Sequence, residues 1–304
     1  MDIRTPRVAV IDDDDEFASL MEALLEEEGY AFSRPDVGAA DLAEAVAAAK
    51  PDVVVLDLRG VYDGGGLALL GRLRAHRALA RLPVLVCSAD IHLLRANAAE
   101  LAGMPGVAAL EKPFRIEALM GALERLLAGT VDPPAVGTPD PEALPAVGEL
   151  LARLGDTLRW PALDAWVPDP RPGMLRCPSA WVASARLAAF AQVSRRTLLP
   201  FGGGLPGRIW VSARPAWVED LAGDMNFPRL PTARRCGLVS AAGVPVTEGD
   251  QIVGVVAVYD QRLRRRDDAA LDRLHEGARV AGPLLRAAAG LTSPSASSAV
   301  SATS

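Results

Sequence analysis

Short apolar runs alternate with amphipathic stretches along the first 128 residues. The runs have the length and the Val/Ile/Leu content of buried strands, and the stretches between them repeat apolar residues at helical spacing. Five strand–helix units of this size predict an α/β domain, a five-stranded parallel, doubly wound sheet over residues 1–128. The predicted strands are 7–11, 30–34, 53–57, 82–87 and 107–111, and the predicted helices are 16–28, 38–49, 67–77, 91–102 and 115–128.

The second half of the chain mixes strand-like and helix-like segments and forms a second predicted domain, residues 147–288. Its first helix carries an apolar stripe, which would pack on the rest of this domain or on a second copy of the chain. The clearest elements are a helix at 147–159, strands at 237–244 and 251–259, and a long helix at about 267–288.

Two further segments lack the pattern of a folded domain. Residues 129–146 hold five prolines, which indicates a stiff linker between the domains. Residues 289–304 form a tail without apolar content from residue 292 on, and we expect it to be disordered because it has little apolar surface to bury.

Polar side chains stand where the strands of the first domain end. The carboxyl ends of parallel strands meet at one edge of a sheet, and ligands bind there at the topological switch point. Closely spaced carboxylates need a cation, because like charges a few Å apart resist joint ionisation. The side chains that we expect at this edge are Asp12, Asp13, Asp57, Ser88 and Lys112.

Lysine is rare in this chain. Only Lys50 and Lys112 are lysines, and every other basic residue is arginine. A lysine kept at 112 fits a compact ammonium with a specific partner better than a generic surface charge.

This edge has the chemistry of a phosphoryl acceptor. Asp57 would be the nucleophile, since a carboxylate attacks a phosphoryl group when a divalent ion neutralises their repulsion. Asp12 and Asp13 suit Mg²⁺, which prefers oxygen ligands, and the backbone carbonyl of Arg59 would complete the protein's share. Lys112 would pair with the phosphoryl oxygens.

Ser88 would donate a hydrogen bond to one of those phosphoryl oxygens. The simpler interpretation is a set of solvated loop residues, which is common for acidic residues after strands. Five polar residues in the right order at the right strand ends favour the site instead.

On these residues, the first domain resembles a response-regulator receiver domain of two-component signalling. The resemblance implies that Asp57 accepts a phosphoryl group from a sensor histidine kinase, with Mg²⁺ bound by Asp12 and Asp13. The carrying motifs are Val10–Asp14, Asp52–Asp57, Cys87–Ala89 and Glu111–Phe114.

Two features depart from that family. The aromatic switch residue, usually three positions before the lysine, is Ala109 here. The loop after Asp57 lacks the usual Met-Pro and is about one residue short by comparison with the motif. The phosphorylation chemistry is intact in this comparison, whereas the aromatic relay is not, so the output surface must change by another route.

Arg59 and Asp90 flank the predicted site, each two residues beyond one of its members. One hypothesis is that they pair across the pocket and limit attack of water on the phosphoaspartate. The alternative is two independent solvated side chains.

Five segments of the second domain form a recognisable series: Gly202–Trp210, Pro215–Asp220, Asn226–Arg229, Cys236–Ala241 and Gln251–Tyr259. On these segments the second domain resembles a GAF domain, which implies an α+β fold with an antiparallel sheet flanked by helices. The family implies a small-ligand pocket or a dimerisation module, and its ligands are too varied to transfer.

Composition narrows the classes of function. The chain has 304 residues and a net charge of −6, and no apolar run is long enough to span a bilayer. The basic cluster Arg262–Arg266 is read as a solvated turn, so we expect no nucleic-acid and no membrane partner. We expect a cytoplasmic protein.

Together these observations predict a two-component response regulator, a phosphoprotein rather than an enzyme, that signals through its GAF-like domain by dimerisation or protein contact. A homodimer is expected. One alternative is a small-ligand-sensing GAF protein whose receiver is a docking platform without phosphorylation. Another is a scaffold whose receiver is never phosphorylated.

Overall fold

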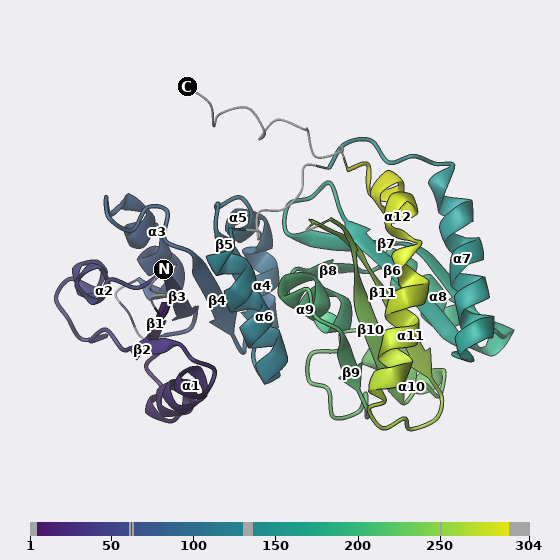
Figure 1. The fold of residues 1–304 in the computed structure, drawn as a ribbon, viewed down its shortest axis with the longest axis horizontal. Coiled ribbons are helices and arrows are strands. Elements are labelled where there is room, and N and C mark those ends of the chain that lie inside the picture. The colour runs from purple at the N-terminus through teal and green to yellow at the C-terminus, as the bar shows by residue number, and fades with distance from the viewer. Residues whose placement is uncertain (1–4, 61, 63, 130–135, 250, 292–304) are drawn as a thin grey trace. The chain divides into compact units, whose positions relative to one another are not determined.

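The computed structural model describes residues 5–60, 62, 64–129, 136–249 and 251–291 (Figure 1). The chain divides into two compact units. The first groups residues 5–129 with 199–216 and 224–228, and the second holds most of the other residues between 136 and 291. Part of the predicted linker and the tail from 292 on lie outside the described residues, so those two predictions are not addressed. Among the described residues, no helix is both long and apolar enough to cross a membrane.

The first unit contains a five-stranded sheet in the order β2-β1-β3-β4-β5, and its strand pairs are parallel. Both the predicted fold of this domain and its five strands are confirmed. The chain moves outward from β1 to β2 and returns to β3 on the other side of β1, which creates a topological switch point. The strands are β1 (Arg7–Ile11), β2 (Ala31–Ser33), β3 (Val53–Asp57), β4 (Val84–Ser88) and β5 (Val107–Glu111).

Helices cover both faces of this sheet. Alternate strand residues such as Ala9, Val54 and Val84 pack against one group of helices, and leucines of those helices complete this core. The helices are α1 (Asp15–Glu27), α2 (Leu42–Ala49), α3 (Gly65–Ala75), α4 (Ile91–Ala96), α5 (Ala98–Ala102) and α6 (Ile116–Leu127). Helices α2 to α5 share the core just described, whereas α6 packs on β3, β4 and β5 from buried residues of its own.

The predicted helix at 91–102 is two helices, because the chain breaks at Asn97. The side-chain amide of Asn97 donates a hydrogen bond of 2.8 Å to the carbonyl of Leu93. Asn97 itself has a φ of −105° and a ψ of 6°, outside the helical region. Asparagine side chains compete in this way with the helical backbone ladder.

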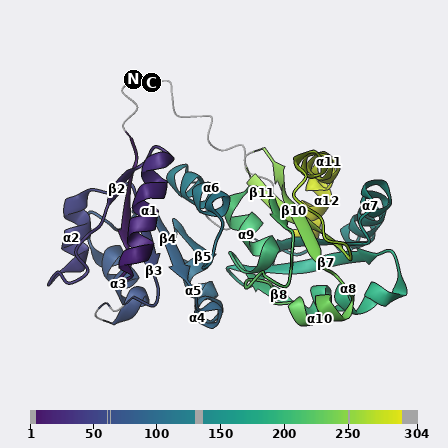
Figure 2. The ribbon, with the colours of Figure 1, turned by 90° about the horizontal axis from the view of Figure 1, so that it is seen from below.

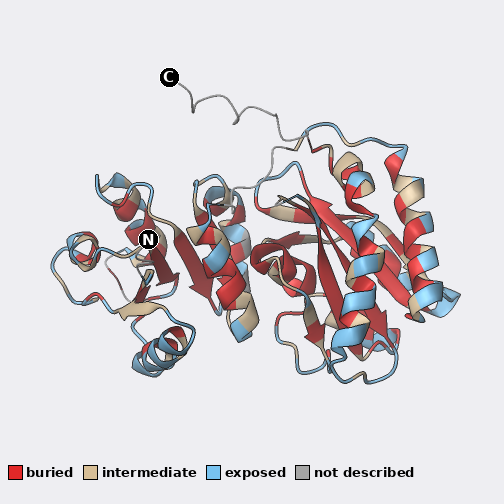
Figure 3. Ribbon diagram, in the orientation of Figure 1, coloured by how far each residue is buried: buried red, intermediate tan, exposed pale blue. Residues whose placement is uncertain are grey.

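The second unit contains a six-stranded sheet in the order β8-β7-β6-β11-β10-β9, and its long strands pair antiparallel, as the GAF resemblance implied. Figure 3 shows that β6, β11 and β10 are buried over nearly their whole length, whereas β7 is only partly buried. The strands are β6 (Ala162–Pro168), β7 (Met174–Val182), β8 (Leu198–Pro200), β9 (Ala216–Val218), β10 (Ser240–Glu248) and β11 (Gln251–Asp260).

One face of this sheet is covered by α7 (Ala143–Leu158), α11 (Asp268–Arg279) and α12 (Gly282–Ala289) (Figure 2). The apolar stripe of α7, including Val147 and Leu151, belongs to the core under these helices. Of the two packing partners predicted for this stripe, the structure therefore shows the helix's own domain.

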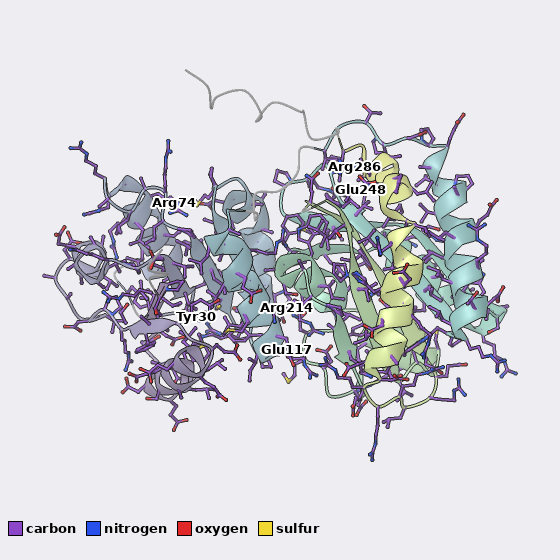
Figure 4. All side chains as sticks on the ribbon, viewed as in Figure 1. Tyr30, Arg74, Glu117, Arg214, Glu248 and Arg286 are labelled. Carbon is purple, nitrogen blue, oxygen red and sulfur yellow. The ribbon has the colours of Figure 1, made fainter. Side chains whose placement is uncertain are left out.

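The predicted helix at 267–288 is also divided, between α11 and α12. Pro283 lies in the first turn of α12, where its missing N–H costs nothing, but it cannot continue the helix before it. The side chain of Arg286 on α12 is paired with Glu248 at the end of β10 (Figure 4). It donates a further hydrogen bond of 3.1 Å to Gln251. These bonds fix α12 on the sheet after the break.

The remaining helices are short. They are the single-turn η1 (Ala185–Leu187), α8 (Ala188–Arg196), α9 (Gly204–Ser212) and α10 (Leu230–Arg235). Of these, α8 packs on β6 and β7, on the face opposite α7, α11 and α12.

The start of α3 crosses closely over the end of β3, and glycine permits this. A Cβ at Gly66 would lie 2.6 Å from the carbonyl oxygen of Asp57 and 2.6 Å from the Cα of Leu58, both of them backbone atoms. By contrast, a Cβ at the exposed Gly71, on the same helix, would meet nothing within 4 Å.

We expect Gly66→Ala to lower the free energy of unfolding by about 1–3 kcal/mol, because the backbone of β3 must move. Gly71→Ala, the matched control, should raise it by about 0.5–1 kcal/mol through helix propensity. Urea unfolding of both variants measures the difference. Equal effects would contradict the close approach of α3 to β3.

Candidate functional site

Four of the predicted side chains meet at the carboxyl edge of the first sheet, since each stands at the end of its strand. Asp12 follows β1, Asp57 ends β3, Ser88 ends β4 and Lys112 follows β5. The ammonium Nζ of Lys112 lies 2.6 Å from Oδ2 of Asp12 and 3.0 Å from Oδ1 of Asp57. The lysine therefore bridges two carboxylates that are distant in the sequence.

Burial strengthens this bridge. Asp12 and Asp57 are 3 % and 8 % exposed. Burial lowers the pKa of Lys112, but the hydrogen bond to Asp12 and the neighbouring negative charges outweigh it, so this pKa is raised above its ordinary value. The ammonium stays charged, and the trio of two carboxylates and one ammonium carries a net negative charge.

Backbone N–H groups occupy the other carboxylate oxygens. The N–H of Arg59 donates to Oδ2 of Asp57 at 2.8 Å, and the N–H of Asp14 donates to Oδ1 of Asp12 at 2.9 Å. These bonds fix both carboxylates so that one oxygen of each faces Lys112.

Ser88 is fully buried beside this trio. Its strand neighbour Cys87 pairs in register with Asp57, which sets the end of β4 against the end of β3. The Ser88 hydroxyl oxygen accepts the N–H of Asp90 at 3.1 Å, and its carbonyl accepts the N–H of Lys112 at 2.8 Å. Ser88 thus ties the lysine's backbone to the start of α4.

The four consecutive aspartates Asp12–Asp15 do not all lie in the site. Asp13 is exposed. Asp14 is the N-cap of α1, where its carboxylate accepts the N–H groups of Glu16 and Phe17 at 2.9 and 3.1 Å. Asp12 is therefore the buried member of the run, and the next residues serve the surface and the helix.

The donor atoms suit Mg²⁺ in chemistry, because Asp12 and Asp57 offer carboxylate oxygens and their negative charge exceeds that of the single ammonium. The fit is partial in geometry. Within the described part of the chain, no group of three Asp, Glu, His or Cys side chains lies close enough to hold a metal ion. Coordination by Asp13 and by the Arg59 carbonyl stays a prediction.

Two aromatic residues border the site, and sequence analysis did not identify either of them. The ring of Phe17 on α1 lies 3.8 Å from Nζ of Lys112, a cation–π contact, and packs edge-on against Phe114 at 6.1 Å. Phe114 is the last residue of the Glu111–Phe114 motif, but nothing in the sequence indicated Phe17.

Tyr62 is the second of these. It is 7 % exposed, and its hydroxyl donates to the carbonyl of Ile11 at 2.9 Å. Burial, followed by the charges of Asp12 and Asp57, raises the pKa of Tyr62 far above its ordinary value, so the phenol stays neutral. Its ring lies against Gly60, where a Cβ would come within 2.0 Å of it. Tyr62 thus connects the loop after β3 to the end of β1.

The predicted flanking pair is weakly formed. Nη1 of Arg59 lies 3.9 Å from Oδ2 of Asp90, and the arginine side chain is 66 % exposed. Asp90 also accepts the N–H groups of His92 and Leu93, and these bonds help to lower its pKa, the Leu93 bond most. The carboxylate of Asp90 is therefore held by α4, and Arg59 is the more exposed partner.

Comparison with protein families agrees with this geometry. The model of the response regulator receiver domain matches residues 8–124, and the model of the GAF domain matches residues 147–285. The chain carries a receiver domain followed by a GAF domain. This is the composition of a two-component response regulator or a related signalling protein. A search of curated proteins found no match.

Solved structures similar to each half were also found. The chemotaxis response regulator CheY4 of Vibrio cholerae is 23% identical, covers 40% of this chain and 98% of its own, and has a TM-score of 0.33. The GAF domain of an Acinetobacter phosphoenolpyruvate-protein phosphotransferase is 12% identical over 57% of this chain and 94% of its own, with a TM-score of 0.39. A free methionine-R-sulfoxide reductase from Neisseria meningitidis is 19% identical over 48% of this chain and 79% of its own, with a TM-score of 0.38.

We expect Tyr62→Phe to lower the free energy of unfolding by about 1 kcal/mol, since the carbonyl of Ile11 loses its donor. Gly60→Ala should cost more, because the new methyl group overlaps the Tyr62 ring. Tyr62→Ala removes the ring itself. The double variant Gly60→Ala/Tyr62→Ala should therefore lose less free energy of unfolding than the sum of the losses in Gly60→Ala and Tyr62→Ala alone. Chemical denaturation checks this, and strict additivity would contradict the contact.

Proposed function

We propose that this protein is a response regulator whose receiver domain is phosphorylated on Asp57 by a sensor histidine kinase. The observation that carries the proposal is the Lys112 ammonium held between Asp12 and Asp57 at 2.6 and 3.0 Å. An ammonium bound directly to a buried carboxylate is placed to neutralise the charge of a phosphoryl group added to that carboxylate.

In the proposed reaction, a carboxylate oxygen of Asp57 forms a bond to the phosphorus of a phosphohistidine, and the phosphorus–nitrogen bond breaks. The electron pair of that bond returns to the imidazole of the kinase. A carboxylate acceptor needs no base to activate it. The chain itself contributes phosphoryl acceptance and loss rather than turnover of a separate substrate.

The neighbouring residues would assist in distinct ways. Lys112 would shift from the carboxylate toward the phosphoryl oxygens, and the Ser88 hydroxyl would donate to one of them. Asp12, Asp13, Asp57 and the Arg59 carbonyl are the proposed ligands of Mg²⁺. When bound, Mg²⁺ supplies neutralisation of the charge that builds up on the transferred oxygens.

The signal would then leave through the 88–112 side of the receiver and alter dimerisation or protein contacts of the GAF domain. Ala109 occupies the position of the usual aromatic switch, so this step would not use that relay. A cytoplasmic location and a homodimer are also part of the proposal.

The full chain, treated with an acyl phosphate and Mg²⁺, should gain the mass of one phosphoryl group. Asp57→Asn should abolish the gain, since an amide is not a nucleophile toward phosphorus at neutral pH. Asp36→Asn, at an exposed loop position, is the matched control and should keep it. Intact-protein mass spectrometry reads the result. A gain that persists in Asp57→Asn, or is missing from the natural chain, would remove the proposal.

Arg59→Ala should shorten the lifetime of the phosphorylated chain by about two- to fivefold. An exposed ion pair is worth up to about 1 kcal/mol, and its loss would admit water more readily. Arg59→Lys, which keeps the charge, should restore most of the lifetime. Decay of the phosphorylated species gives the rate, and an unchanged rate in Arg59→Ala would show that the two side chains act independently.

A cavity in the second unit favours a second candidate, small-ligand sensing. It has a volume of about 430 Å³, within the range of small-molecule sites. Trp160 and Trp181 line it together with charged residues that include Arg159 and Arg262. Titration calorimetry of the full chain with cyclic nucleotides and other small metabolites tests this candidate, and Trp181→Ala should remove any heat of binding at this cavity.

A further inference from the structure

An arginine is buried in the interior of the second unit. The side chain of Arg229 is 2% exposed. It lies on the side of the six-stranded sheet where α8 packs, opposite the core under α7, α11 and α12. Burying a guanidinium is costly unless a counter-charge and hydrogen-bond acceptors replace its water.

The counter-charge is Asp164 on β6. Nη1 of Arg229 lies 2.5 Å from Oδ2 of this carboxylate, and the hydroxyl of Ser194 donates to the same oxygen at 2.9 Å. The other oxygen accepts the indole N–H of Trp166 at 2.7 Å and the hydroxyl of Tyr259 at 2.9 Å. Asp164 is therefore held in place by three groups besides the arginine.

Aromatic rings surround the guanidinium. Its central carbon lies 4.8 Å from the ring centre of Trp166, 4.9 Å from that of Phe190 and 5.2 Å from that of Tyr259. Phe190 and Tyr259 are also packed edge to face, with ring centres 4.8 Å apart. Three rings within about 6 Å of a cation, with a carboxylate beside it, form a strong cation-binding cage.

The cage and its occupant come from different parts of the fold. Asp164, Trp166 and Tyr259 stand on the central strands β6 and β11, and Phe190 and Ser194 stand on α8. Arg229 is the N-cap residue of the short helix α10 and comes at the end of a connecting segment. The central strands and α8 thus supply the side chains that surround the cation, whereas the segment that leads into α10 supplies the cation itself.

We propose that these five residues form a cation-binding site of the GAF domain, that Arg229 is its tethered occupant, and that a small ligand bearing a guanidinium group is the chemical class the site accepts when Arg229 is absent. Without Arg229 the site would hold one buried carboxylate and no cation, which disfavours anionic ligands. This inference is independent of phosphorylation at Asp57.

The test uses the full chain with Arg229→Gly, which removes the side chain and leaves the cage. Its melting temperature should fall by roughly 10 °C, as expected when one partner of a buried ion pair is lost. Millimolar methylguanidinium chloride should then raise it by about 3 °C, whereas urea, a neutral analogue of similar shape, and sodium chloride should not.

Two controls separate binding from a general effect. The natural chain, with its cage filled, and Arg234→Gly, at an exposed position of α10, should show no response specific to methylguanidinium. Equal responses of Arg229→Gly to methylguanidinium, urea and sodium chloride would overturn the proposal and leave an ordinary buried ion pair.

A milder variant covers the case in which Arg229→Gly does not fold. Arg229→Ala also empties the cage but gives the unfolded chain less backbone freedom than glycine does, so methylguanidinium should still raise its melting temperature above the urea and salt controls. Absence of that selective rise in Arg229→Ala would equally reject a guanidinium site.

Discussion

The first unit depends on one ammonium held between two buried carboxylates. Asp12 and Asp57 come from adjacent strands, and their charges would repel each other at the edge of the sheet without Lys112 between them. The parallel topology makes this arrangement possible, because it brings the ends of β1, β3 and β5 to the same edge. Backbone N–H groups then fix the carboxylate oxygens that Lys112 does not reach. The site is thus a property of strand order as much as of residue type.

Sequence analysis predicted the features that follow from regular periodicity and from the residue at the end of each strand. The strands of the first sheet and the meeting of Asp12, Asp57 and Lys112 follow from apolar runs that each end in a polar residue. It did not predict where single residues compete with a helical backbone. The Asn97 side chain breaks one predicted helix, and Pro283 interrupts another. Contacts that depend on the path of a loop were also missed. Nothing in the pattern shows that a tyrosine of the β3–α3 connection returns to β1, or that a phenylalanine of α1 lies over Lys112.

The two units each bury a cation beside aspartate, and the differences between them matter. Lys112 stands at a sheet edge, and its side chain is 17% exposed, so it has room to change partners. Arg229 lies deep against three aromatic rings, where its partners leave it no comparable freedom. A lysine point charge suits the first environment and a planar guanidinium suits the second. The same pairing of charges thus leaves the lysine partly exposed in one unit and encloses the arginine in the other.

The contact between Ser88 and Asp90 has a mechanical consequence. One hydroxyl oxygen holds the backbone of a residue whose carboxylate in turn holds the first turn of α4. A rotation of that hydroxyl toward a new acceptor would release an amide at the mouth of a helix only six residues long. Because so short a helix has few backbone hydrogen bonds of its own, little else would keep its first turn in place. That turn would loosen or re-form as a unit. In the proposed mechanism, a single torsion angle at position 88 would therefore be coupled to α4 through hydrogen bonds alone, without an aromatic ring.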